Sequence, residues 1–267
     1  MAMTSYLLDN VAPQTGGRFA GLEACYDGST FGYLSALGLG EGWRCWEIGA
    51  GGGSVVRWMA AQVGESGSVL GTDLNLDWID AGMPRQVELR RHDVTSDEIP
   101  CSSYDLIHAR LVLLHLPDRD EVIERLVAAL APGGWLMLEE FDQIFPPCPE
   151  PATDEQRTFN RVREAFSELL ARRGANTTTY PRTLPWRLQR AGLSETGAEG
   201  SLVFATGAGP GAAVQRANLV QTGDQAVDAG LITADDLTTF LRVLGDPGFT
   251  FTMPLLISAW GWRPPAV

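Results

Sequence analysis

The segment from residue 43 to residue 64, WRCWEIGAGGGSVVRWMAAQVG, constrains the fold more than any other part of the chain. An apolar run ends at Glu47 and Ile48, a glycine-rich turn follows, and a helical pattern of apolar residues begins at Val55. Glycine permits backbone angles that other residues avoid and lets a ligand approach the bare main chain, while the following helix points free N–H groups at that ligand. The segment therefore predicts a strand, a glycine turn and a helix that together bind a nucleotide-like cofactor.

The glycine spacing separates two kinds of cofactor. Dinucleotide-binding turns use Gly-x-Gly-x-x-Gly, and Ser54 occupies the place of the third glycine when the count begins at Gly49 and Gly51. The pattern that fits is acid-x-Gly-x-Gly-x-Gly, at Glu47, Gly49, Gly51 and Gly53. It resembles the first motif of class I S-adenosylmethionine (SAM)-dependent methyltransferases. That resemblance implies SAM as the cofactor and S-adenosylhomocysteine (SAH) as the product.

Acidic residues at the ends of the next two predicted strands favour the same cofactor. Asp73 ends the strand SVLGTDL, twenty residues after Gly53, where a carboxylate can accept hydrogen bonds from both ribose hydroxyls. A third strand is predicted from residue 86 to about residue 92, with Asp93 at its end. In the resembled family this acid bonds the adenine amine and the backbone of the next residue, here Val94, faces the ring. The alternative for Asp93 is a turn cap.

Two later motifs extend the resemblance. YDLIHARLVLLHLPD predicts a buried strand from Tyr104 to Ala109 and then a turn through Arg110 toward His115, as in the fourth methyltransferase motif. Arg110 would hold the methionine carboxylate or the acceptor, or would form a surface salt bridge. Leu-x-Pro-Gly-Gly at residues 130–134 precedes the fifth strand, WLMLEEFD, as it does in that family. The predicted cofactor-binding residues are Glu47, Gly49, Gly51, Gly53, Asp73, Leu74, Asp93, Val94, Ala109 and Arg110.

The resemblance implies the α/β, Rossmann-like class I methyltransferase fold, a seven-stranded, mostly parallel sheet with an antiparallel last strand, and the alternation of predicted strands and helices agrees with it. Glycine and proline breaks divide residues 1–40 into two or three predicted short helices, which would form an N-terminal helical cap; packing on the sheet flank is the alternative. Residues 41–267 are expected to form the SAM-binding methyltransferase domain. Two helical stretches at about residues 208–246 predict a helical lid inserted between the last two strands. Asp118 with Glu121 predicts a capping box on the helix before the fifth strand.

Catalytic candidates follow the fourth and fifth strands. Methyl transfer from a sulfonium is an in-line displacement, so the protein orients the reactants, excludes water and, when needed, removes a proton. His115 follows the fourth strand, where the methyl group is expected, and a histidine can act as a base near neutral pH. Glu139, Glu140 and Asp142 end the fifth strand, and alternation places Glu140 and Asp142 on one face and Glu139 on the other. His115 and Glu140 are the catalytic candidates.

Substrate contacts are predicted for Tyr26, Tyr33 and Asp142. Core packing is the alternative for the two tyrosines, and solvated carboxylates at a strand end are the alternative for Glu139, Glu140 and Asp142. His92 and His108 lie within predicted strands and are expected to be hydrogen-bonded structural residues.

The composition excludes several classes of protein. All twenty basic side chains are arginine, so the chain lacks the lysine of short-chain dehydrogenases, P-loop enzymes and pyridoxal enzymes. A formal net charge of −13 argues against nucleic-acid partners. No His pair has ligand spacing, and no metal is expected. The four cysteines, which form no C-x-x-C pair, are Cys25, Cys45, Cys101 and Cys148.

The sequence contains no apolar run of about 18 residues and no secretory signal pattern, so we expect a cytoplasmic monomer or homodimer without membrane association. The whole chain resembles actinobacterial small-molecule methyltransferases of secondary metabolism and is similar to enzymes that methylate carbon in indole-type substrates. The expected function is therefore methylation of a small-molecule acceptor. The alternatives are O- or N-methylation of a phenol, amine or acid, and a non-catalytic SAM-binding regulator.

Overall fold

The computed structural model describes residues 7–99, 103–144, 146–148 and 153–265. Its centre is a seven-stranded sheet in the order β3-β2-β1-β4-β5-β9-β6. β9 runs antiparallel to both of its neighbours, and the pairs among β1 to β5 are parallel. The predicted sheet is therefore confirmed, including its antiparallel last strand. The strands are β1 (Arg44–Ile48), β2 (Ser68–Asp73), β3 (Val87–Arg91), β4 (Tyr104–Arg110), β5 (Leu130–Asp142), β6 (Ser194–Ser201) and β9 (Leu255–Trp262).

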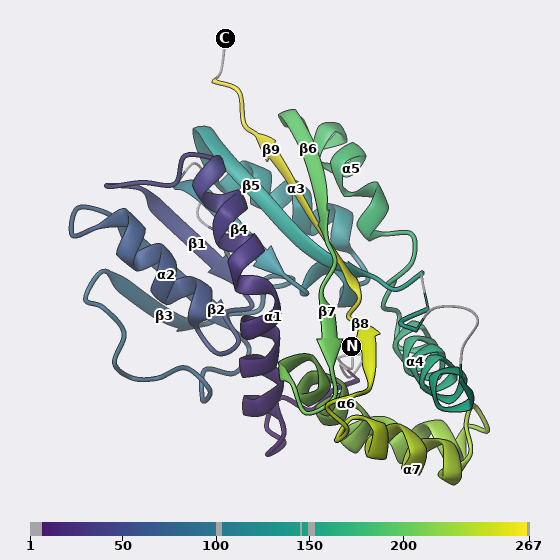
Figure 1. Ribbon diagram of the computed structural model, residues 1–267. Coiled ribbons are helices and arrows are strands. Elements are labelled where there is room, and N and C mark those ends of the chain that lie inside the picture. The colour runs from purple at the N-terminus through teal and green to yellow at the C-terminus, as the bar shows by residue number, and fades with distance from the viewer. Residues whose placement is uncertain (1–6, 100–102, 145, 149–152, 266–267) are drawn as a thin grey trace.

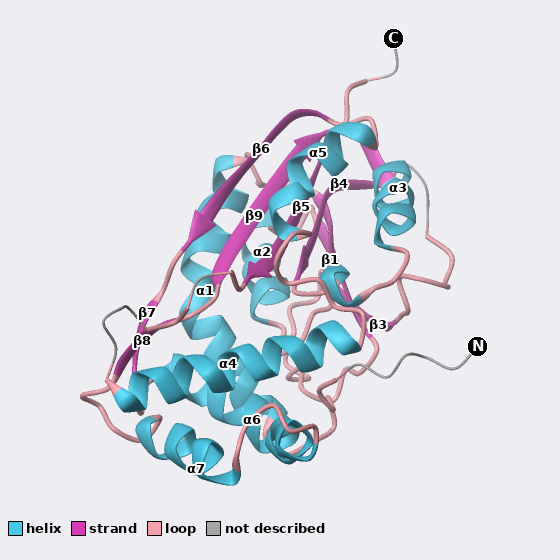
Figure 2. Cartoon of the chain, turned by 90° about the vertical axis from the view of Figure 1, so that its right-hand side faces the viewer, coloured by secondary structure: helices cyan, strands magenta, loops and turns pink. Residues whose placement is uncertain are grey.

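Helices cover both faces of this sheet (Figures 1 and 2). α1 (Thr15–Ala36) and α2 (Ser54–Val63) lie on one face, and α3 (Arg119–Ala129) and α5 (Leu184–Arg190) lie on the other. Side-chain alternation divides the strands between two cores, as in β1, where Cys45 joins the core that contains α2 and Trp46 joins the core that contains α3. Residues next to each other on a strand therefore meet different surroundings.

A third layer of helices lies beyond the carboxyl ends of the parallel strands, at the bottom of Figure 1. It contains α4 (Asp154–Arg172), α6 (Pro210–Asp228) and α7 (Ala234–Val243). α6 and α7 are the two helical stretches predicted within residues 208–246. The short strands β7 (Phe204–Thr206) and β8 (Thr250–Thr252) pair with each other at the base of this insertion. Its action as a lid stays a prediction.

Residues 7–40, the described part of the N-terminal region, contain one helix of 22 residues, α1, so the prediction of two or three short helices is wrong for this part. Tertiary packing explains the difference. A Cβ atom on Gly21 would lie only 2.7 Å from both the Pro210 carbonyl oxygen and a methyl carbon of Val214, so glycine lets α1 approach α6 closely. Gly21 is therefore one of the glycines that suggested a break, but in the structure it allows two helices to pack closely.

The N-termini of α4 and α3 differ in their caps. Thr153 and Gln156 form the capping box of α4, with both reciprocal hydrogen bonds present. The box predicted for Asp118 and Glu121 at α3 is wrong, because the Asp118 side chain makes no capping hydrogen bond. Asp118 has φ −99° and ψ 43°, outside the extended conformation in which a cap side chain folds back onto the helix.

Candidate active site

The turn between β1 and α2 requires its glycines. Gly49, Gly51 and Gly53 have φ values of 71°, 54° and 85°, in the left-handed region that favours glycine. Asp73, at the end of β2, reaches across to this turn, and its Oδ2 accepts a hydrogen bond of 2.9 Å from the Gly51 N–H. Its Oδ1 accepts from the Asn75 N–H at 3.1 Å. The structure thus brings the predicted glycine motif and the predicted ribose acid together.

The other residues predicted to contact the adenosine lie along the same edge of the sheet, after β2 and β3. Leu74 is 51% exposed, a large apolar side chain left open beside Asp73. Asp93 caps its own turn, because its Oδ1 accepts from both the N–H and the hydroxyl of Thr95, at 2.9 and 2.6 Å. Val94 is buried. The turn-cap alternative describes the Asp93 side chain in this structure.

α1 lies close over the glycine turn. A Cβ atom on Gly51 would be 3.3 Å from the Phe19 ring, and one on Gly52 would be 2.3 Å from a carboxylate oxygen of Glu23. Burial raises the pKa of Glu23, and the nearby Asp27 carboxylate raises it further. A larger residue in the turn would therefore collide with α1 as well as distort the backbone.

A buried hydrogen-bonded network connects the turn to α1. His108 Nδ1 lies 2.6 Å from Glu47 Oε2, and His108 Nε2 lies 3.1 Å from Glu139 Oε2. The hydroxyls of Thr30, on α1, and Ser258, on β9, both donate to Glu139. Burial alone would lower the pKa of His108, but the two carboxylates raise it to about 9. His108 is hydrogen-bonded as predicted. Glu47, two residues before Gly49, contributes its carboxylate to this network and not to the surface of the turn.

Arg110 connects the end of β4 to α1. Its Nη2 donates to Asp27 Oδ1 at 2.9 Å, and its Nη1 donates to the Thr30 hydroxyl at 3.0 Å. Ala109, beside it, is fully buried. Arg110 therefore forms a salt bridge that is only slightly exposed, at the edge where the predicted cofactor-binding residues gather.

The two catalytic candidates meet at η1 (Leu113–His115), the turn after β4. Glu140 has no exposed surface, and its Oε1 accepts from the Leu114 N–H at 3.0 Å. Burial raises the pKa of Glu140 to about 8. His115 is half-buried; desolvation, followed by the positive charges of Arg18 and Arg119, lowers its pKa to about 3. At neutral pH the carboxyl is mostly protonated and the imidazole is neutral.

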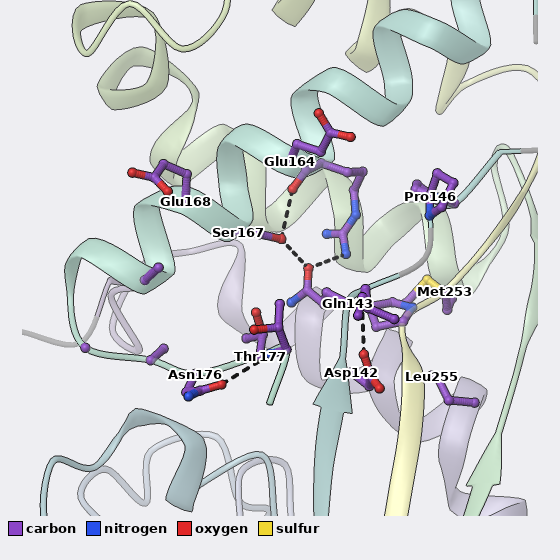
Figure 3. A pocket seen from close by; sticks show the side chains of 18 of the residues that line it. Asp142, Gln143, Pro146, Glu164, Ser167, Glu168, Asn176, Thr177, Met253 and Leu255 are labelled. Atoms are coloured by element: carbon purple, nitrogen blue, oxygen red, sulfur yellow. Dashed lines mark hydrogen bonds between the residues drawn. The ribbon is translucent and has the colours of Figure 1, made fainter. Parts of the chain in front are cut away.

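A cavity of about 1420 Å³ opens at the carboxyl end of β5, one strand along from β4 (Figure 3). Its walls include α4, residues 174–178 and residues 252–255. Of the predicted catalytic and substrate residues, only Asp142 lines it. The Asp142 carboxylate is held by the Ile144 N–H at 3.0 Å and by the Arg182 guanidinium. Glu140 and Asp142 share one face of β5 and Glu139 points to the other, as alternation predicts.

Tyr26 and Tyr33 are predicted to contact the acceptor, with core packing as the alternative. In the structure both are packed against other aromatic side chains, as that alternative describes. Tyr26 is fully buried; its hydroxyl donates to the Pro254 carbonyl at 2.8 Å and its ring lies 5.2 Å from that of Phe141. Tyr33 packs against Trp260, with ring centroids 5.9 Å apart. Trp260 pairs with Met137, whereas the cavity lies beyond Asp142, so Tyr33 sits well back from the carboxyl end of β5.

Sequence reasoning missed Arg163, which lies on α4, lines the cavity and is only 6% exposed. A signal was present: Phe159, Val162 and Phe166 define the buried stripe of α4, and Arg163 falls inside that stripe at helical spacing. A charged residue within an apolar stripe indicates either a buried partner or a ligand.

The remaining predictions concern metals, thiols and membranes. Within the described residues, no group of three or more His, Cys, Asp and Glu side chains could hold a metal ion. Cys25, Cys45 and Cys148 are free thiols, and Cys101 lies outside the described residues. None of the helices in the described ranges is long and apolar enough to cross a membrane.

Comparisons with known proteins place this geometry in a family. A family model described as a methyltransferase domain matches residues 29–195. The chain is 37% identical over 111 residues to methyltransferase str2 of Strobilurus tenacellus, which covers 41% of this chain and 39% of the relative. It is 27% identical over 120 residues to the ubiquinone/menaquinone biosynthesis C-methyltransferase UbiE of Laribacter hongkongensis, covering 43% and 49%. Each match thus spans less than half of the relative's length.

Among solved structures, phosphoethanolamine N-methyltransferase 2 of Haemonchus contortus, in a complex with SAH, shares the fold. Its TM-score is 0.60 at 16% identity, over 100% of this chain and 61% of the other. With a family model that matches more than half of the sequence, the chain belongs to the methyltransferase-domain family.

Proposed function

We propose that this protein transfers a methyl group from SAM to a small-molecule acceptor. The observation that carries the proposal is the glycine turn at residues 49–53, with Asp73 bonded across it, inside a methyltransferase domain. When bound, SAM supplies an electrophilic methyl group on a sulfonium. The bare backbone of the turn would hold its methionine part and Asp73 its ribose. The exposed Leu74, with Asp93 and Val94, would hold the adenine.

Glu47, Ala109 and Arg110 support this site in the proposal. Glu47 is fixed by His108 and so steadies the end of β1 directly before the turn. Arg110 holds α1 over the turn through Asp27, which would exclude water from the reacting groups. These contacts suit the pre-arranged surroundings that an in-line displacement needs, because orientation of the reactants can lower its barrier by roughly 7–11 kcal/mol.

The acceptor, we propose, enters the cavity at the carboxyl end of β5. This end of the sheet lies next to β4, where the proposed cofactor site ends, and ligands of open α/β sheets bind at the carboxyl ends of the strands. An aromatic carbon of an indole-type compound in secondary metabolism is the acceptor we favour. The similarity to UbiE, whose name describes a C-methyltransferase, supports methylation at carbon.

His115 does not line the cavity but lies on the turn after β4, beside the proposed cofactor site. We propose it as the base for an acceptor that reaches from the cavity toward β4, and Glu140 as the residue that holds this turn. A ring carbon that gains a methyl group must lose its proton for the ring to regain aromaticity, and that proton is strongly acidic. An imidazole with a pKa of about 3 is too weak a base for an amine or phenol but can accept such a proton. Glu140 has no exposed surface with which to touch an acceptor.

The test is incubation of the protein with methyl-labelled SAM and a panel of indoles, phenols, amines and 2-oxo acids. We expect label on a ring carbon of an indole-type compound, together with SAH. Label on oxygen or nitrogen would overturn the carbon assignment, and SAM binding without transfer to any compound would favour a non-catalytic SAM-binding protein. Calorimetry with SAM and NAD, in wild type and Gly51→Val, checks the cofactor: the variant should lose SAM binding, because a φ of 54° strains the valine backbone and its side chain crowds Phe19.

We further propose that the protein works in the cytoplasm as a monomer or homodimer, without nucleic-acid or membrane partners. The formal net charge of −13 supports the exclusion of nucleic acids, whose phosphates would be repelled. Size-exclusion chromatography with light scattering measures the oligomeric state.

A further inference from the structure

Arg163 is a buried cation held by neutral side chains. Its Nη1 donates to Gln215 Oε1 at 2.6 Å and its Nη2 donates to Gln143 Oε1 at 2.9 Å. Its guanidinium lies 5.7 Å from the centre of the Phe166 ring. These two hydrogen bonds use only part of the N–H donors that a guanidinium carries.

No negative charge balances this cation within the described part of the chain. None of the ion pairs there includes Arg163, and the only titratable neighbour that affects its pKa is the Tyr26 hydroxyl. Burial lowers the pKa of Arg163 to about 10, so the guanidinium is still charged at neutral pH. Buried charges in proteins are normally paired, because removing an ion from water without a partner is costly.

The orientation of the Gln143 side-chain amide provides a second hydrogen-bond donor beside Arg163. Its Oε1 accepts from both Arg163 and the Ser167 hydroxyl, at 2.9 and 2.7 Å, which fixes the amide because the reverse orientation would set N–H groups against the guanidinium (Figure 3). The Nε2 group of Gln143 therefore points away from these donors and makes no hydrogen bond to the described residues. Gln143, Arg163 and Ser167 all line the cavity.

We propose that Arg163 and the Gln143 amide bind a carboxylate of the acceptor in this cavity. The inference rests on the proposed function and deepens it: the substrate class becomes small aromatic acids rather than neutral aromatic compounds. A carboxylate supplies the negative charge that Arg163 lacks and accepts from several N–H donors at once. Six acidic side chains also line the cavity. Five are exposed, so solvent screens them far more than a group buried against the guanidinium: Asp118, Asp120, Glu121, Glu164 and Glu168. The sixth, Asp142, is buried but its charge is already paired with the Arg182 guanidinium.

The experiment compares each acid with its uncharged amide. Calorimetry of the full-length protein, with and without SAH, measures the dissociation constants of indole-3-acetate and indole-3-acetamide, and of 4-hydroxybenzoate and 4-hydroxybenzamide. In at least one pair we expect the acid to bind about tenfold or more tightly, the scale of a charge-assisted hydrogen bond. Equal affinity within both pairs, or no binding of either acid, would overturn the proposal.

Two variants assign the preference to Arg163. Arg163→Met removes the charge and should abolish the preference for the acid. Arg161→Met is the matched control, because Arg161 lines the same cavity from α4 but is exposed and paired with Asp236 at 2.6 Å. It should keep the preference. An acid preference that survives in folded Arg163→Met contradicts the assignment.

If Arg163→Met does not fold, Gln143→Glu provides a second test of the proposal. The new carboxylate would supply the missing counter-charge from within the protein, so thermal stability should rise while the preference for the acid disappears. A purely structural Arg163 would change stability alone. The proposed function fails separately: a protein that prefers acids but does not bind SAM would contradict the methyltransferase proposal and leave the carboxylate site in place.

Discussion

Glu139 and Glu140 are neighbours in the chain and both are fully buried, yet their carboxyl groups meet opposite surroundings. Glu139 points to the α1 side of the sheet, where it accepts from two hydroxyls and contacts the His108 imidazole. Glu140 points to the other side, where Oε1 accepts the Leu114 N–H and Oε2 has no partner among the described residues. The pKa of Glu139 is lowered because His108 outweighs burial, and that of Glu140 is raised to about 8 because nothing does.

The difference shows how one strand serves two purposes. On the α1 side, paired charges tie β1, β4, β5 and α1 together beneath the proposed cofactor site. On the other side, an uncharged carboxyl fixes the turn that carries His115 and borders the layer that holds the cavity. Burial is equal at the two residues, so the partners alone decide the protonation state.

The largest effect is expected from Glu139→Gln. This change leaves the protonated His108 with one carboxylate fewer and should lower the free energy of unfolding by roughly 3–5 kcal/mol, the scale for breaking a buried ion pair. Urea unfolding at pH 7 measures it. Glu140→Gln is the control, because an amide replaces a mostly protonated carboxyl. Equal losses in the two variants would show that both glutamates are charged.

The second effect is a pH dependence in Glu140→Gln. With a pKa raised from 4.5 to about 8, Glu140 contributes stability that is fully present below pH 4.5 and is lost as pH rises through 8. This loss amounts to at most about 1.4 kcal/mol per pH unit for one proton. Glutamine does not titrate, so the variant should gain stability relative to wild type between pH 5 and 8. Parallel stability curves in that range would contradict a neutral Glu140.

A smaller effect concerns cofactor binding at the α1 side. Asp73→Ala should weaken SAM binding by roughly 1–3 kcal/mol, the cost of losing hydrogen bonds to a charged group. Asp142→Ala is the matched control, since Asp142 also ends a strand but lines the cavity. Calorimetry with SAM distinguishes them. An unchanged dissociation constant in Asp73→Ala would remove the ribose assignment.

The strands and the glycine turn could be predicted because each depends on residues close together in the chain, and the sheet followed from the family resemblance that those motifs carry. The acid-x-Gly-x-Gly-x-Gly pattern requires the three positive φ angles that the structure has. The pairing of Glu47 with His108 could not be predicted, because it depends on the register of β1 against β4, which sets these two residues opposite each other. A sequence motif therefore located Glu47 without revealing its contact.

Tertiary contacts explain the other differences. Glycines suggested breaks in α1, but Gly21 is where the helix packs on α6. Tyr33 follows Tyr26 by about two turns of α1, and only the direction of the helix shows that Tyr33 is remote from the cavity. Arg163 could have been singled out from the apolar stripe of α4, although its uncharged partners come from α6 and the end of β5.

The smallest expected effect is that neither His108 nor His115 titrates near neutral pH, and this tests both faces of the sheet at once. His108, with a pKa of about 9, should stay protonated between pH 5.5 and 7.5, and His115, with a pKa of about 3, should stay neutral. Imidazole ¹⁵N shifts from NMR distinguish the two forms directly, and His108→Gln and His115→Gln assign the signals. His115 moving through a midpoint near 6.5 would make it an ordinary base, able to serve nitrogen or oxygen acceptors, and would remove the argument for carbon. Titration of His108 in the same range would instead mean that Glu47 and Glu139 do not hold its proton, and the contrast between the two faces would disappear.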